Sequence, residues 1–174
     1  MLKEIYDQPK AYRDTMGSRI APDGKSVTLN ELTITPEAIR KISRVHIVAC
    51  GTAFHAGMVG KYVIEKMARI PVETDVASEY RYRSPIITKD TLVIVVSQSG
   101  ETADTLAALR EAKRCGAHVL AITNVVGSSV AREANDIITT WAGPEIAVAS
   151  TKAYTSQLIG FYLLGLHLAQ TLGT

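Results

Sequence analysis

Short runs rich in valine and isoleucine alternate along this chain with longer segments of helical periodicity. That alternation builds a parallel sheet with helices on both faces. The near-continuous apolarity of the runs suits strands that are covered on both sides. We expect strands at residues 45–49, 92–96 and 118–123, with weaker candidates at 136–140 and 71–75. The sequence therefore predicts an α/β fold.

Helices are expected in the gaps between these strands, at residues 52–69 and 102–115. Residues 2–17 read as an amphipathic helix, and residues 151–172 as a long helix that is apolar nearly all round and needs partners on every side. The length of 174 residues fits one domain. We expect a leader of helix and loop over residues 1–35, packed on a domain formed by 36–174. The apolar end of the chain suggests a piece of something larger.

Charge and hydropathy exclude several classes of partner. The chain has 19 basic and 17 acidic side chains, and a net charge of +2 gives no field for attracting nucleic acid. Its most apolar segment, residues 158–169, is shorter than the ~20 residues that span a bilayer. The N-terminus lacks the apolar stretch of a signal peptide, and the two cysteines do not form a disulfide pattern. We therefore expect a cytoplasmic protein with no membrane partner.

The histidines give no sign of a metal site. They are His46, His55, His118 and His167. None stands in the helical i, i+4 arrangement with glutamate that marks a zinc site. We expect no metal and no cofactor.

The strongest functional signal follows the predicted strand at 92–96. Ser97, Gln98, Ser99 and Thr102 lead directly into a helix, whose free backbone N–H groups favour an anion. Three hydroxyls and an amide can add donors at the same point. The alternative is that Ser99 only caps the helix, although capping needs one hydroxyl. The turn lacks the lysine and the spaced glycines of nucleotide loops, which points to a small phosphate ester.

A second turn follows the strand at 45–49. Gly51 would let the backbone approach a ligand closely, and Thr52 could bind a sugar. Equally, Gly51 could make a tight turn and Thr52 could cap the next helix. The spacing alone leaves both interpretations open.

A third segment, residues 142–152, is an irregular loop that enters the last helix. Ser150 could be its N-cap or a ligand-binding residue. Lys152 in the first turn opposes the helix dipole, which suggests that an anionic group or a partner surface accepts it. Glu145 is the only carboxylate on the pocket side, and it is the one candidate for a catalytic base.

Together these motifs resemble the glutamine:fructose-6-phosphate amidotransferases, also called glucosamine-6-phosphate synthases. The runs that carry the resemblance are Cys50-Gly51-Thr52, Ser97-Gln98-Ser99-Gly100-Glu101-Thr102-Ala103-Asp104-Thr105 and Val148-Ala149-Ser150-Thr151-Lys152-Ala153. The resemblance covers almost the whole chain and identifies it with the first of the family's two sugar isomerase (SIS) domains. It implies a three-layer, five-stranded parallel sheet flanked by helices, a relative of the flavodoxin-like fold, and a role in amino-sugar biosynthesis.

The resemblance also assigns substrate-binding residues by motif. They are Gly51, Thr52, Ser97, Gln98, Ser99, Thr102, Val148 and Ser150. The hydroxyls of the serine turn would hold the phosphate with Gln98 beside it, and Thr52 and Ser150 would bind sugar hydroxyls. The backbones of Gly51 and Val148 would assist. Ala53 stands where the family often has serine, so one hydroxyl contact is absent.

The family's remaining machinery has no counterpart in this sequence. The family's glutaminase uses an N-terminal cysteine, and its isomerase places a glutamate, a lysine and a histidine in the second SIS domain and the C-terminal tail. We therefore expect the substrate-binding half of an aminotransferase, which binds fructose 6-phosphate or glucosamine 6-phosphate, forms a homodimer and is inactive alone. Two alternatives are a non-catalytic sugar-phosphate sensor and a stand-alone isomerase completed across a dimer.

Overall fold

A computed structural model describes all 174 residues of the chain. Its sheet has five strands, β1 Arg44–Ala49, β2 Val72–Val76, β3 Thr91–Ser97, β4 His118–Thr123 and β5 Asp136–Thr139. Their order is β2-β1-β3-β4-β5, and every neighbouring pair is parallel. The predicted five-stranded parallel α/β fold is confirmed, and each expected strand lies within about two residues of its predicted position.

Burial along the strands follows their position in the sheet. All seven residues of β3 are buried, and β1 and β4 are buried beyond their first residue. The edge strands are less buried, since β5 alternates between buried and half-buried residues and only the first residue of β2 is buried. Near-continuous apolar runs therefore mark the three central strands, as expected for a sheet covered on both faces.

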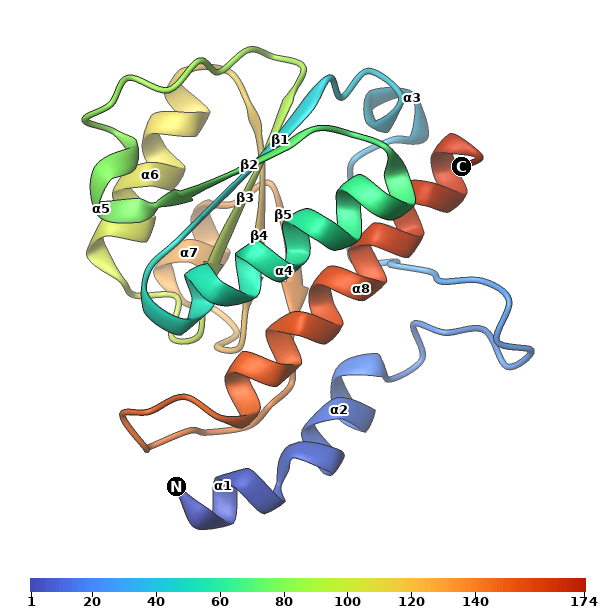
Figure 1. Cartoon of the computed structure of the whole chain (residues 1–174), viewed down its shortest axis with the longest axis vertical. Coiled ribbons are helices and arrows are strands. Elements are labelled where there is room, and N and C mark those ends of the chain that lie inside the picture. Colours follow the sequence, from blue (N-terminus) through green and yellow to red (C-terminus); the bar gives the residue numbers. More distant parts are fainter.

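Helices cover both faces of the sheet and create two cores (Figure 1). The helices are α1 Leu2–Tyr6, α2 Gln8–Met16, α3 Pro36–Ile39, α4 Gly51–Ala68, α5 Ala77–Tyr80, α6 Ala103–Arg114, α7 Ser129–Glu133 and α8 Lys152–Leu172. Helices α4 and α8 pack side by side over one face, whereas α5, α6 and α7 lie over the other. No helix of the fold combines the length and the apolarity needed to cross a bilayer.

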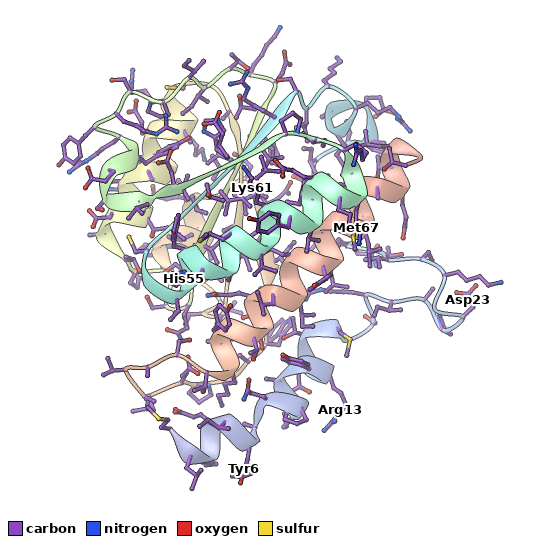
Figure 2. The ribbon with its side chains drawn as sticks, viewed as in Figure 1. Tyr6, Arg13, Asp23, His55, Lys61 and Met67 are labelled. Carbon is purple, nitrogen blue, oxygen red and sulfur yellow. The ribbon has the colours of Figure 1, made fainter.

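The leader differs from the single helix expected over residues 2–17. It forms two helices that meet at Asp7, and Pro9 stands in the first turn of α2. Proline is tolerated there because the first N–H groups of a helix have no partner within it. Helix α2 packs along α8 (Figure 1), while Tyr6 and Arg13 point away from the rest of the chain (Figure 2).

The strand order creates a switch point between β1 and β3. From β1 the chain passes through α4 to β2, and from β3 it passes through α6 to β4 on the other side. The chain therefore turns in opposite directions at the neighbouring strands β1 and β3. In parallel sheets such a switch point leaves a crevice beyond the carboxyl ends of the two strands, where ligands bind.

Candidate functional site

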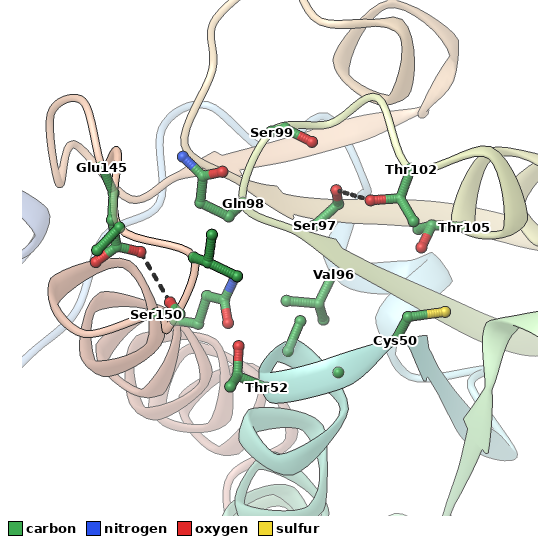
Figure 3. A pocket seen from close by; sticks show the side chains of 15 residues that line it. Cys50, Thr52, Val96, Ser97, Gln98, Ser99, Thr102, Thr105, Glu145 and Ser150 are labelled. Atoms are coloured by element: carbon green, nitrogen blue, oxygen red, sulfur yellow. Dashed lines mark hydrogen bonds between the residues drawn. The ribbon is translucent and has the colours of Figure 1, made fainter.

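A pocket of about 450 Å³ lies at this switch point (Figure 3). Its walls come from the ends of β1 and β3, the starts of α4, α6 and α8, and the loop before α8. The lining residues are Cys50, Gly51, Thr52, Ala53, Val96, Ser97, Gln98, Ser99, Thr102, Thr105, Glu145, Ala147, Val148, Ser150 and Gln157. The structure thus brings all the substrate-binding residues expected from the sequence around one cavity. Its volume is within the usual range for small-molecule sites.

The serine turn between β3 and α6 is held by its own hydroxyls. Ser97 is buried, and its Oγ accepts a hydrogen bond from the Gly100 N–H at 3.0 Å and lies 3.0 Å from Thr102 Oγ1. Ser99 Oγ accepts from the Glu101 N–H at 3.2 Å. The N-cap of α6 is Thr102, whose side chain makes no capping bond. Ser99 is therefore not the helix cap.

Backbone donors are available at the same point. The N–H groups of Ser99 and Thr102 have no backbone acceptor, as is normal where a helix begins. They lie beside the hydroxyls of the turn, and α6 directs the positive end of its dipole to the same place. This end of the pocket consists of neutral donors and can bind an anion.

Gly100 is required in this turn for two reasons. Its φ of +67° lies in the left-handed region, which side chains rarely adopt. A Cβ at this position would also lie 2.0 Å from Ser128 Oγ and 3.0 Å from Thr123 Oγ1. The turn therefore packs tightly against the end of β4 and the start of α7, and a residue larger than glycine would displace the turn or its neighbours.

The start of α4 leaves a hydroxyl free. The N-cap of this helix is Cys50, which makes no side-chain capping bond, and Gly51 turns the chain with a φ of +57°. Thr52 is exposed and is not the cap. The sequence left two interpretations open. Capping by Thr52 is wrong, because α4 already begins at Gly51 and its N-cap is Cys50.

Glu145 caps the start of α8. Its carboxylate accepts from Ser150 Oγ at 2.8 Å, from the N–H and the Oγ1 of Thr151 at 2.9 Å each, and from the Ala153 N–H at 3.3 Å. A negative charge at a helix N-terminus is stabilised by the dipole. The arrangement fixes Ser150 at the edge of the pocket. It also occupies the carboxylate, which speaks against Glu145 as a base.

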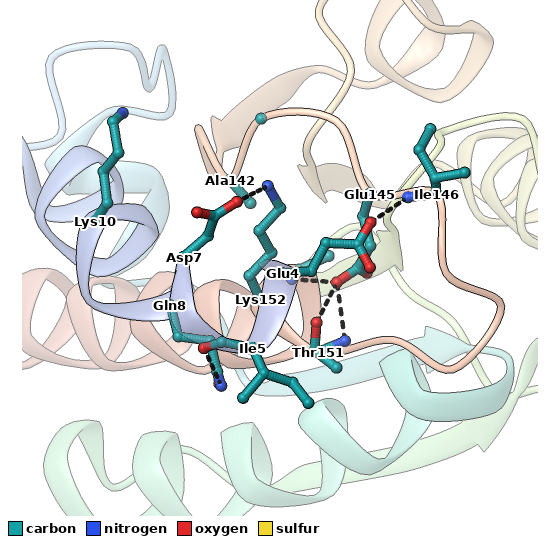
Figure 4. Close-up of polar contacts among 12 residues, drawn as sticks. Glu4, Ile5, Asp7, Gln8, Lys10, Ala142, Glu145, Ile146, Thr151 and Lys152 are labelled. Atoms are coloured by element: carbon teal, nitrogen blue, oxygen red, sulfur yellow. Dashed lines mark hydrogen bonds and ion pairs between the residues drawn. The ribbon is translucent and has the colours of Figure 1, made fainter. Parts of the chain in front are cut away.

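Lys152 points away from the pocket, toward the leader (Figure 4). It is buried, and its Nζ lies 3.3 Å from Asp7 Oδ2. The anionic group expected to accept this lysine is therefore a residue of the chain itself. Beside it, Glu4 Oε1 accepts from the N–H groups of Ile146 at 2.6 Å and Ala147 at 3.3 Å. The hydrogen bond from Ile146, more than any other contact, lowers the pKa of Glu4 to about 2.

Two buried polar residues of the lining were not among the site residues expected from the sequence. Thr105 and Gln157 are only 1% and 2% exposed, and their Oγ1 and Oε1 atoms have no hydrogen-bond partner. Thr105 follows Thr102 by three residues, which places both on one side of α6. Gln157 is a polar residue on the buried side of α8. The sequence contains both polar residues, but only the packing of α6 and α8 shows that they line the pocket.

The pocket contains a single ionisable carboxylate, that of Glu145, and no lysine, arginine or histidine. His55 is exposed and does not line it. The chain contains no group of three or more histidine, cysteine, aspartate or glutamate side chains placed to hold a metal ion. What the arrangement offers a ligand is hydrogen bonding.

Comparison with known proteins agrees with this geometry. Residues 38–166 match the model of the SIS domain. The chain is 71% identical over all 174 residues to a glutamine–fructose-6-phosphate aminotransferase (isomerizing) of Clostridium acetobutylicum, and 67% identical to that of Clostridium tetani. It spans 28% of the length of each of these curated relatives.

A solved structure gives the same picture. The C-terminal domain of glucosamine-fructose-6-phosphate aminotransferase from Francisella tularensis superposes with a TM-score of 0.90 at 43% identity. The match covers 99% of this chain and 48% of that domain. This chain is therefore similar to about half of the Francisella domain.

Proposed function

The chain belongs to the SIS domain family, and from this premise we propose that it binds fructose 6-phosphate or glucosamine 6-phosphate as the first SIS domain of a glutamine–fructose-6-phosphate aminotransferase. The observation that carries the proposal is the pocket at the switch point of the sheet. It has neutral hydrogen-bond donors at one end and the hydroxyls of Thr52 and Ser150 at the other. In the parent enzyme it would serve amino-sugar biosynthesis.

The phosphate belongs at the serine turn. The hydroxyls of Ser97, Ser99 and Thr102 surround the start of α6, and Gln98 lies beside them (Figure 3). Neutral hydroxyls and N–H groups suit a monoester dianion, since hydrogen bonds to a charged acceptor are about twice as strong as neutral ones. The lining contains no lysine or arginine, so hydrogen bonds alone would hold the phosphate.

The sugar extends from there toward α4 and α8. Thr52 has an unengaged hydroxyl at the start of α4, and Ser150 stands opposite it at the start of α8 (Figure 3). Gly51 and Val148 contribute backbone groups to the same wall. Ala53 is buried and adds no polar group. The chain's part in the reaction is to hold the phosphate and orient the carbon chain, because Glu145 is already engaged as a helix cap.

We further propose that the domain works paired with a second SIS domain and within a homodimer. Apolar side chains stay exposed on the outer side of α4 and α8, among them Tyr62, Tyr162 and Leu166. Such groups on neighbouring helices favour a protein partner. The curated relatives are more than three times as long as this chain, and the Francisella domain is about twice as long. Those lengths leave room for the partner domain.

The test is thermal unfolding with fructose 6-phosphate, glucosamine 6-phosphate and unphosphorylated fructose. A ligand at a hundred times its Kd adds about 2.7 kcal/mol of stability. We expect both phosphorylated sugars to raise the Tm and fructose to leave it unchanged. The double substitution Ser99→Ala with Thr102→Ala should remove the effect. Ser43→Ala, which lies just before the amino end of β1 and does not line the pocket, should keep the stabilisation by phosphorylated sugars. Equal stabilisation by fructose, or a response that survives the double substitution, would overturn the proposal.

A further inference from the structure

Gln157 occupies an unusual place in α8. The buried side of this helix includes Ala153, Phe161, Leu164 and Leu168. Gln157 stands in the same stripe, four residues after Ala153 and four before Phe161, and only 2% of it is exposed. A glutamine is rarely this buried without paired hydrogen bonds.

The amide is not satisfied within the protein. Its Oε1 is buried and has no hydrogen-bond partner, while the side chain lines the pocket. Leaving a buried acceptor unpaired costs free energy, and an apolar side chain of similar size would avoid that cost. The amide is therefore unfavourable for folding, and the side chain lies in the wall of the pocket.

Gln157 belongs to the sugar end of that cavity. Helices α4 and α8 cover one face of the sheet, whereas the serine turn leads into α6 on the other. Thr52 and Ser150 form the wall on the α4 and α8 side, away from Thr102 and Thr105 (Figure 3). Gln157 lies in the second turn of α8, which begins two residues after Ser150, so it lies deeper in the same wall.

We propose that Gln157 recognises the hydroxylated carbon chain of the bound sugar phosphate. An amide carries donors and an acceptor, and rotation about its terminal torsion exchanges the two ends. A hydroxyl or keto oxygen of the ligand accepts from Nε2, or a hydroxyl donates to Oε1. Either bond gives the amide a partner only when a sugar is present. This role rests on the proposed function and adds a residue outside the motifs that suggested it.

The experiment compares Gln157→Leu with Ser156→Ala by titration calorimetry. Ser156 is the matched control because it is fully buried, its Oγ also has no partner, and it does not line the pocket. The probes are fructose 6-phosphate and inorganic phosphate. We expect Gln157→Leu to weaken the binding of fructose 6-phosphate about tenfold, which corresponds to about 1.4 kcal/mol. The affinity of this variant for inorganic phosphate should change less than about twofold. The Ser156→Ala variant should bind both probes as the wild type does.

Denaturant unfolding separates recognition from a structural role. Substituting a residue that holds the fold together would lower the stability of the protein. We instead expect Gln157→Leu to be at least as stable as the wild type, because the unpaired acceptor is gone. If the branched leucine disturbs packing, Gln157→Met offers a flexible replacement of similar length. Unchanged affinity for fructose 6-phosphate in both variants overturns this role and leaves the proposed function standing. A wild-type chain that binds no sugar phosphate overturns both.

Discussion

The two walls of the pocket are built in different ways. The hydroxyls of the serine turn bond to residues no more than five positions away, as between Ser97 and Thr102. Among the side chains of this turn, only that of Glu101 also accepts from a more distant group, the Ser129 N–H. The loop before α8 and the first residue of α8 are instead attached to the leader, through hydrogen bonds that Glu4 and Asp7 accept across more than 140 residues. The hydroxyls at the proposed phosphate end are thus positioned by residues close in the sequence, whereas the proposed sugar end depends on how the leader docks. Substitutions in the two walls should therefore have different consequences.

The largest effect is expected at Gly100, where the local wall is most constrained. Gly100→Ala combines a φ of +67° with a clash against Ser128, so we expect a loss of about 3 kcal/mol of unfolding free energy. Binding of fructose 6-phosphate should also be lost, because the turn must move. Urea unfolding and calorimetry measure the two effects.

Gly127→Ala provides the matched control for this substitution. Gly127 also has a positive φ, +73°, but nothing lies within 4 Å of an added Cβ. Only the backbone strain applies there, which costs about 1 kcal/mol. If Gly100→Ala is no less stable than Gly127→Ala, the turn is not held by its contact with Ser128, and this wall is less constrained than its packing indicates.

The next effect concerns the ion pair that attaches the second wall to the leader. Asp7→Asn leaves the buried Lys152 ammonium without a charged partner, and we expect a loss of about 2 kcal/mol, reduced from the value for a fully buried pair because Asp7 is one-third exposed. Adding Lys152→Met should restore much of that stability.

A double-mutant cycle measured by denaturant unfolding provides the coupling energy. The control is the exposed pair Lys10 and Asp14 on α2, whose loss should cost less than about 1 kcal/mol. Equal coupling in the two pairs would show that Lys152 is solvated and that the loop does not depend on the leader.

The same contrast explains what could be predicted from the sequence. The strands and the serine turn were predicted correctly because apolar runs and residues at a helix start act over a few positions. Gly51 and Thr52 were harder, because the sequence did not show that α4 begins at Gly51. The break at Asp7 in the leader was missed, since amphipathic periodicity continues across it.

Contacts between distant segments could not be predicted. The sequence suggested an anionic partner for Lys152 but not that Asp7 supplies it, and nothing local reveals that Gly100 meets Ser128. Gln157 became a candidate only when α8 was seen to face the pocket. The boundary at residue 35 remains a prediction, and so do the roles of the pocket residues, which the binding experiments test.

A smaller effect is expected from Glu145, which connects the second wall to the start of α8. Glu145→Gln keeps the size of the side chain but removes the charge at the helix N-terminus, so we expect a loss of about 1 kcal/mol. Ser150 should become less fixed, which would weaken fructose 6-phosphate a few-fold. Thr35→Ala removes a comparable cap on α3, away from the pocket, and should lower stability without changing affinity. Unchanged affinity in Glu145→Gln would show that the cap does not position Ser150.

The smallest effect tests whether the leader is coupled to the pocket through Glu4. The hydrogen bond from Ile146, and next the Met1 ammonium, lower the pKa of this carboxyl from an ordinary value of 4.5 to about 2. Its contribution to stability is therefore fully present above about pH 4.5 and is lost as the pH falls through about 2. The difference in Tm between wild type and Glu4→Gln should shrink over that window.

Glu37→Gln distinguishes this coupling from a general loss of a carboxylate. The pKa of Glu37 is also lowered, mainly by its own backbone N–H, but Glu37 lies on α3 and makes no contact with the loop before α8. Both variants should therefore lose a pH-dependent part of their stability. Only Glu4→Gln should also weaken fructose 6-phosphate at neutral pH, by about twofold, because it releases the backbone of Ile146 and Ala147 next to Val148. If both variants keep full affinity at neutral pH, the leader stabilises the fold without shaping the sugar end of the pocket, and the two walls are less different than their contacts indicate.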